Sequence, residues 1–179
     1  DSVIESAGEG YDFVYILGDN YTLPDNVEGL YLYSQGAVTG TGNVLANVIY
    51  GNNIGNVLDG AGGADHLWGF EGNDTFVFRA GQSDGDVVWD FQGNGAGAGD
   101  VLRFVGFGPG ATLNQINATQ WVIASANGTI SEVFTLANGA TLDDTDYVLI
   151  PTLIATTFSV AGAPINNAGM TFADDAVFA

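Results

Sequence analysis

Glycine recurs at nine-residue intervals in the middle of the chain, and this spacing constrains the fold more than any other feature. Gly42, Gly51, Gly60 and Gly69 each begin a nine-residue unit. The aligned units share an amide or acidic residue at the sixth position and an apolar residue at the eighth: Asn47, Asn56, Asp65 and Asp74, then Ile49, Leu58, Leu67 and Phe76. This pattern is typical of a parallel β-roll, in which glycine turns join short strands that each point one side chain inward.

Segments on both sides of these units also have strand patterns. Residues 11–17 and 29–33 precede the units, and residues 86–91, 101–104, 121–124, 132–136 and 147–150 follow them between glycine-rich breaks. The sequence therefore predicts an all-β chain with four parts. These are an N-terminal β-strand unit (1–41), a short parallel β-roll (42–92), an antiparallel, sandwich-like β cap (93–150) and a C-terminal tail (151–179).

The charge of the chain restricts its partners. Two basic residues oppose 21 acidic ones, so the net charge is −19 and the natural partners are cations rather than nucleic acid or an anionic membrane surface. At 46% hydrophobic residues the chain is too apolar for uniform disorder. It contains no cysteine, which excludes thiolate metal sites and thiol catalysis. No apolar run is long enough to span a bilayer, and no N-terminal signal peptide is visible.

Two of the units carry the motif that points to chemistry. Residues 60–68 read Gly-Ala-Gly-Gly-Ala-Asp-His-Leu-Trp, and residues 69–77 read Gly-Phe-Glu-Gly-Asn-Asp-Thr-Phe-Val. They resemble the nonapeptide of the repeats-in-toxin family, Gly-Gly-x-Gly-x-Asp-x-(apolar)-x. Calcium takes six to eight oxygen ligands from carboxylates and carbonyls, and a tight glycine turn directs several carbonyls toward one point.

The resemblance implies a set of calcium ligands and neighbouring residues. The acidic residues 84, 86 and 90 are expected to close the sites above Asp65 and Asp74, and the carbonyls of the second and fourth turn positions are expected to contribute. The full predicted set is Gly60, Ala61, Gly62, Gly63, Asp65, Gly69, Phe70, Glu71, Gly72, Asp74, Asp84, Asp86 and Asp90. The other readings are that Asp65 and Asp74 cap their own turns and that Asp84, Asp86 and Asp90 form a solvated strand edge.

The first two turns depart from the motif. Two nonapeptides complete one coil of a two-sided roll, so each turn stacks on the turn two units earlier, and Asp65 should lie above Asn47 and Asp74 above Asn56. The lower partners are amides, and Leu45 stands at a position where the family has glycine. We expect weak calcium binding or none at these two turns.

The resemblance also implies a function. Residues 1–32 are similar to an extended repeat unit of the family and residues 74–150 to its terminal module. Such modules belong to extracellular proteins that Gram-negative bacteria export through a type I secretion apparatus, and the last six residues, 174–179, are similar to an uncleaved C-terminal secretion signal. The module would be structural rather than catalytic, and it would fold when it binds calcium outside the cell.

Two other functions remain open at this stage. The chain could be a self-assembling subunit of a surface layer, filament or matrix, or an adhesin, in which its own copies are the partner. It could also be a carbohydrate-binding module for surface polysaccharide, which would require aromatic residues exposed in a row. Trp68, Trp89 and Trp121 could provide such a platform, although tryptophan in β proteins more often packs in the core. His66, the only histidine, is expected to point outward.

Overall fold

The computed structural model describes residues 3–8, 10–18, 20–33, 36, 38–93 and 98–150. This part of the chain is all-β and contains no helix. None of the described residues therefore forms a helix that could cross a membrane. The tail, 151–179, lies outside the described residues, and so do the expectations that concern it.

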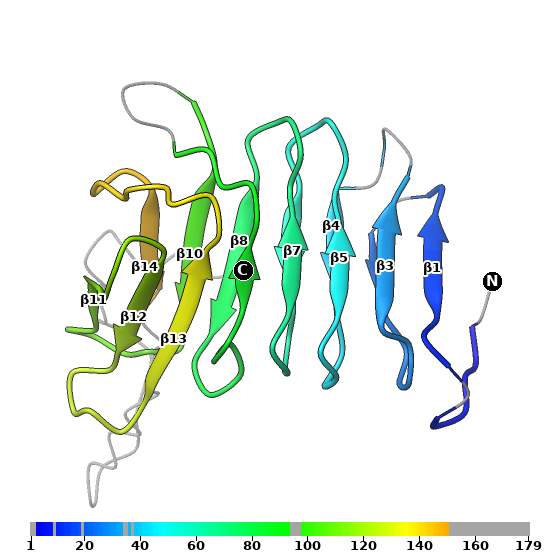
Figure 1. Ribbon diagram of the computed structural model, residues 1–179, viewed down its shortest axis with the longest axis horizontal. Coiled ribbons are helices and arrows are strands. Elements are labelled where there is room, and N and C mark those ends of the chain that lie inside the picture. Colours follow the sequence, from blue (N-terminus) through cyan, green and yellow to red (C-terminus); the bar gives the residue numbers. More distant parts are fainter. Residues whose placement is uncertain are drawn as a thin grey trace, which may run out of the picture.

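The strands form two sheets that face each other, and within each sheet the strands follow one another along one axis (Figure 1). The long sheet has eight strands, in the spatial order β1 (Phe13–Ile16), β3 (Gly29–Leu32), β5 (Val48–Tyr50), β7 (His66–Trp68), β9 (Val87–Val88), β13 (Ser131–Leu136), β12 (Gln120–Ala124) and β11 (Thr112–Gln115). The short sheet has six strands, in the order β14 (Tyr147–Ile150), β10 (Val101–Val105), β8 (Thr75–Arg79), β6 (Val57–Asp59), β4 (Thr39–Thr41) and β2 (Tyr21–Thr22). Odd and even strands alternate between the sheets as far as β10, which is the topology of a β-roll.

Strand register follows the predicted period. Ile49 of β5 pairs with Leu67 of β7, and Leu58 of β6 pairs with Phe76 of β8, so each of these coils consists of two nonapeptides. The coils that follow are longer, because the turns that lead into β9 and β10 contain insertions. Strand β9 nevertheless pairs in parallel with β7, and β10 with β8, so the insertions lengthen the turns and leave the sheets continuous.

The core lies between the two sheets and is filled by the eighth-position residues. Ile49, Leu58, Leu67 and Phe76 are fully buried, as the sequence predicts. Residues before and after the nonapeptides continue the same cluster, among them Leu30, Val88, Leu102 and Phe104. Because each strand is short and alternates inward and outward side chains, one apolar residue per strand builds most of the core.

The C-terminal cap is smaller than the sequence suggested. Antiparallel pairing occurs only among β11, β12 and β13 within the described part of the chain. Strands β10 and β14, which the sequence placed within the antiparallel part, pair in parallel and extend the short sheet. The reason is visible in the inward residues of β10, Leu102 and Phe104, which continue the apolar ladder of the roll.

Candidate functional site

The turns between strands gather along the two edges of the roll (Figure 1). We call the turns that enter the long sheet the first turn row: 42–47, 60–65 and 80–86. The turns that enter the short sheet form the second turn row: 51–56, 69–74 and 89–100, of which residues 94–97 lie outside the described part. Each predicted acidic residue lies on one of these rows.

The two motif turns share an unusual backbone conformation. Ala61 and Phe70, at the second position, have φ values of 65° and 68°, and Gly63 and Gly72, at the fourth, have 116° and 128°. The left-handed region is unfavourable for Ala and Phe, so the surrounding structure must hold them there. Glycine is required at position 63, because a Cβ atom there would lie 2.3 Å from the carbonyl oxygen of Leu45 in the turn below.

The two asparagine turns close differently. The side-chain oxygen of Asn47 accepts a hydrogen bond from the backbone N–H of Asn43 at 2.7 Å, and Asn56 does the same for Asn52. The amide nitrogen of Asn47 donates to the carbonyl oxygen of Val27 at 3.1 Å and to the side-chain oxygen of Asn43 at 3.2 Å. Amide groups therefore hold these turns together.

The motif turns lack this closure, because their second-position N–H groups are bonded elsewhere. The N–H of Ala61 donates to Oδ1 of Asp59 at 3.0 Å, and the N–H of Phe70 donates to Oδ2 of Asp90 at 2.9 Å. The sixth-position carboxylates of Asp65 and Asp74 thus do not cap their own turns in the way that the asparagines do.

In the first turn row, three sixth-position residues stack above one another. The N–H of Asn47 donates to Oδ1 of Asp65 at 2.7 Å, and the N–H of Asp65 donates to Oδ1 of Asp86 at 2.9 Å. The structure thus places Asp65 above Asn47, as the repeat period predicts. Asp86, which the sequence expected to close the site, occupies the equivalent place one coil further on.

The second turn row repeats the arrangement. The N–H of Asn56 donates to Oδ1 of Asp74, and the N–H of Asp74 donates to Oδ1 of Asp100, both at 2.8 Å. Asp90 lies beside this stack and accepts the N–H groups of Gly69 and Phe70. Asp74 therefore stands between the amide of one coil and a carboxylate of the next.

Three carboxylates in the two turn stacks each have one buried oxygen that makes no hydrogen bond within the described part of the chain. The Oδ2 atoms of Asp65, Asp74 and Asp86 have no hydrogen-bond partner among the described residues. Asp65 and Asp86 are neighbours in the stack, so two such oxygens belong to one edge of the roll. Isolated buried carboxylate oxygens are strongly unfavourable unless a proton or a cation compensates them.

Backbone oxygens near these carboxylates are also available. Within the described part of the chain, no hydrogen bond is made to the carbonyl oxygens at the second and fourth positions of the motif turns, Ala61, Gly63, Phe70 and Gly72. These are the four carbonyls that the sequence motif proposed as ligands. Their freedom from other bonds leaves them able to coordinate a cation.

Burial changes the protonation of the stacked acids. Burial raises the pKa of Asp74 to about 7, and the nearby charges of Asp100 and Asp90 act in the same direction. Burial also raises the pKa of Asp65 and of Asp86, with a further contribution to Asp65 from the charge of Asp86. Without a cation, these sites therefore favour bound protons near neutral pH.

The chain matches no family model and no curated protein. Among the described residues, no group of three or more acidic or histidine side chains converges as a metal site. A cation in these turns would therefore need carbonyl oxygens as well as the carboxylates, which is the ligand set that glycine turns provide.

The remaining predicted residues lie further from the stacks. Asp84 is exposed, and its Oδ1 accepts a hydrogen bond from the N–H of Val133 in β13 at 2.8 Å. This carboxylate therefore links its turn to the C-terminal cap and does not join the stack of sixth-position residues. Glu71 is exposed at the outer end of its turn. Gly60 and Gly69 make room for the carboxylates, since a Cβ atom at either position would lie 2.2 Å from Oδ2 of Asp65 or Asp74.

Sequence reasoning missed Asp100 and Glu132. Asp100 was hidden by the insertion that separates it from Asp74, although the sequence that follows it, Val-Leu-Arg-Phe, alternates like Thr-Phe-Val-Phe after Asp74. Glu132 comes from β13, is buried, and has an Oε2 atom with no partner among the described residues. Its charge contributes to the raised pKa of Asp86, after the larger effect of burial.

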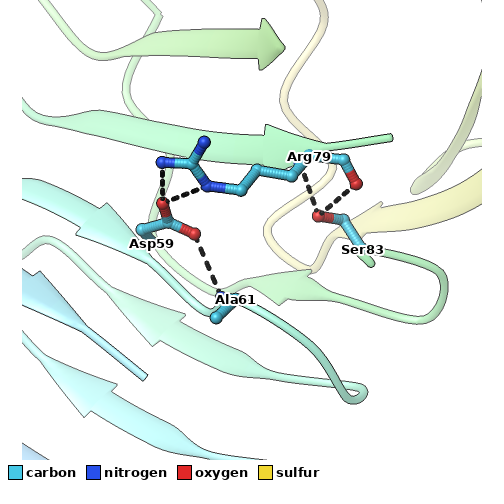
Figure 2. A network of polar contacts seen from close by, with 4 residues as sticks. All are labelled: Asp59, Ala61, Arg79 and Ser83. Carbon is cyan, nitrogen blue, oxygen red and sulfur yellow. Dashed lines mark hydrogen bonds and ion pairs between the residues drawn. The ribbon is translucent and has the colours of Figure 1, made fainter. Parts of the chain in front are cut away.

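Asp59 was also missed, and it links the first turn row to a basic residue. Figure 2 shows its carboxylate between the Arg79 guanidinium and the N–H of Ala61. Oδ2 of Asp59 lies 2.7 Å from both Nε and Nη2 of Arg79, while Oδ1 holds Ala61. The pair therefore fixes the second position of a motif turn from the side of the short sheet.

Proposed function

We propose that this chain is a calcium-binding β-roll module of the repeats-in-toxin type. The observation that carries the proposal is the pair of stacked carboxylates, Asp65 and Asp86, each with one buried oxygen that lacks a partner among the described residues. The unbonded carbonyls of Ala61 and Gly63 belong to the same turn. Together they supply negative charge and neutral oxygens at one edge of the roll.

The chemistry of this donor set favours calcium over other common metals. The available donors are carboxylate and carbonyl oxygens, which suit hard cations, whereas the chain has no cysteine. His66 does not contribute a nitrogen donor to these turns, because its side chain accepts a hydrogen bond from Trp89 on the outer face of the long sheet. Magnesium requires a strict octahedral geometry and retains water, while calcium accepts the irregular arrangement of a turn.

The second turn row supports the same assignment. Asp74 has its own buried Oδ2 without a partner in the described part, and the free carbonyls of Phe70 and Gly72 lie in its turn. The asparagine turns, by contrast, use their side-chain amides to bond the backbone. We therefore assign calcium to the motif turns and none to turns 42–47 and 51–56.

Calcium binding would couple folding to the surroundings of the chain. In a cytoplasm with little free calcium, the buried carboxylates oppose closure of the motif turns and the chain stays able to thread through a secretion apparatus. Outside the cell, calcium compensates these charges and drives folding. On this proposal the protein is extracellular, is exported by a type I apparatus of a Gram-negative bacterium, and acts structurally rather than as an enzyme.

Direct titration tests the proposal. The full chain, stripped with a chelator, is titrated calorimetrically with calcium and, separately, with magnesium. We expect calcium to bind with high preference over magnesium, and we expect the double variant Asp65→Asn, Asp86→Asn to lose binding at the first turn row alone. Absence of calcium binding at millimolar concentration, or binding that the double variant leaves unchanged, would contradict the assignment.

A further inference from the structure

A glutamate of the C-terminal cap, Glu132, occupies an inward-facing position of β13. It shares one face of the strand with Phe134 and Leu136, which are buried, and it is itself only 4% exposed. Its partner in the neighbouring strand β12 is Ile123, which is also buried. An apolar side chain would be ordinary at such a position, so the carboxylate requires a compensating group nearby.

The carboxylate of Glu132 reaches the last turn of the first turn row, 80–86. Its Oε1 accepts a hydrogen bond from the backbone N–H of Gly81. The backbone of β13 is tied to the same turn, because the N–H of Gly85 donates to the carbonyl oxygen of Val133 at 2.8 Å. The cap and the last turn of the row are therefore joined next to Glu132.

Two buried carboxylate oxygens remain without compensation at this junction. Oε2 of Glu132 and Oδ2 of Asp86 make no hydrogen bond within the described part of the chain. Burial raises the pKa of Asp86, and the negative charge of Glu132 raises it further, so the two carboxylates are close enough to repel one another. Among the described residues, no basic side chain forms an ion pair with either acid, and Arg79 is paired with Asp59.

Neutral oxygens are available in the same turn. The carbonyl oxygens of Gly81 and Gln82 accept no hydrogen bond from any described residue, and both residues are exposed to water. Calcium combines carboxylates with carbonyl oxygens and water molecules. In the described part of the chain, no three acidic side chains converge on one point. Glu132 therefore does not join Asp65 and Asp86 in a single cluster, and only Asp86 can be common to both pairs.

We propose that Asp86 and Glu132 hold a calcium ion between the first turn row and the cap. This junction site is additional to the sites of the motif turns, and it rests on the proposed calcium-binding function, because the ion is the same. Without the ion, a buried carboxylate of the roll and one of the cap oppose each other across the junction. Calcium therefore fastens the cap to the roll as well as closing the motif turns.

The second turn row ends without such a demand. Asp100 stands at the end of its stack, and both of its carboxylate oxygens are bonded. Oδ1 accepts the N–H of Asp74 and Oδ2 accepts the N–H of Gln92, both at 2.8 Å. The need for an ion beyond the last turn is therefore particular to the first row, where the cap supplies Glu132.

The number of calcium ions bound by the full chain tests this proposal, measured by calorimetric titration after treatment with a chelator. Glu132→Gln keeps an oxygen for the N–H of Gly81 and removes the charge. We expect it to bind one calcium ion fewer, or to bind that ion about tenfold more weakly or worse. Glu132→Leu, which resembles the apolar residues on the same face of β13, should lose the same ion.

Asp144→Asn is the matched control, since Asp144 is exposed and its substitution removes the same unit of charge. It should bind calcium like the unaltered chain. Amide hydrogen exchange in saturating calcium reports on the cap: in Glu132→Gln, β12 and β13 should exchange faster than in the control, whereas β5 to β8 should not change. Circular dichroism in calcium shows that each variant is folded.

The inference is overturned if folded Glu132→Gln and Glu132→Leu bind as many calcium ions as Asp144→Asn, with the same affinities. Asp65→Asn separates this result from a failure of the proposed function. If Asp65→Asn loses calcium and the two Glu132 variants do not, the motif turns bind calcium and the junction does not. If the unaltered chain binds no calcium, the proposed function and this inference are both wrong.

Discussion

The backbone N–H of Asn47 donates a 2.7 Å hydrogen bond to Oδ1 of Asp65, in the turn directly above it. This bond ties one coil of the roll to the next through a side chain rather than through the sheet. It also fixes the Asp65 carboxylate so that its other oxygen, Oδ2, is buried without a partner among the described residues. Folding and the proposed cation binding therefore depend on the same carboxylate.

Calcium should raise both the β-content and the melting temperature of the chain. A ligand that binds only the folded state stabilises it by about 2.7 kcal/mol at 100 times its dissociation constant. Far-ultraviolet circular dichroism and thermal unfolding with calcium or with a chelator measure this effect, and magnesium serves as the control. Identical spectra and melting temperatures in calcium and chelator would rule the effect out.

The two kinds of turn should respond differently to substitution. Asp65→Asn keeps an oxygen for the Asn47 N–H but removes the charge, so calcium affinity should fall by about tenfold or more. Asp74→Asn should act likewise on the second turn row. Asn47→Ala removes a neutral amide and should change calcium affinity far less, although it loses hydrogen bonds. Equal losses of affinity in the three variants would refute this grading of the turns.

Acid should partly replace calcium. The folded-state pKa of Asp74 is raised to about 7 from an ordinary value of 3.8, so the folded state holds a proton that the unfolded state releases between these values. Without calcium, stability should therefore be greatest below about pH 4 and should fall as the pH rises through about 7. Denaturant unfolding in chelator at several pH values measures this. Asp74→Asn should flatten the fall, and an unaltered slope in that variant would show that other groups cause it.

The Asp59–Arg79 ion pair should stabilise the motif turn. Arg79→Gln leaves the Asp59 carboxylate, which is 6% exposed, without its cation. We expect a loss on the order of 1 kcal/mol, because the half-exposed guanidinium is screened by solvent. Arg103→Gln is the control, since Arg103 is the only other arginine or lysine in the chain. Denaturant unfolding of both variants in calcium decides the matter, and equal losses would assign the effect to net charge alone.

The regular part of the fold was predictable from the sequence because a strict period leaves few alternatives. The glycine units from Gly42 to Phe76 keep one period, and the structure places the inward residues and the stacked turns where this period requires. Prediction was weaker for the coils beyond Asp74, because insertions in their turns break the period. The parallel pairing of β10 and β14 was missed for this reason, since an interrupted period resembles a separate antiparallel unit.

The same irregularity hid parts of the site and most of the aromatic contacts on the outer face of the long sheet. Asp100 and Glu132 reach the turn rows from segments that carry no glycine motif. The rings that contact one another along this face are unevenly spaced along the chain, so no single period connects them, and only the strand pairings bring them together: Tyr15, Tyr31, Tyr50, Trp68 and Trp89. Asp59 and Arg79 meet because their strands are neighbours in the short sheet, and a pair of this kind has no local sequence signal.

The asparagine turns make one end of the repeat region chemically different from the other. Turns 42–47 and 51–56 are closed by their own amides, whereas turns 60–65 and 69–74 leave carboxylate oxygens open, so the two ends of the repeat differ in what they require from the solution. Each coil contacts only its neighbours, so folding can begin in one coil and spread to the next. Folding would then spread from the asparagine turns toward the motif turns. The ionic composition of the surroundings would set how far along the axis the folded coils extend.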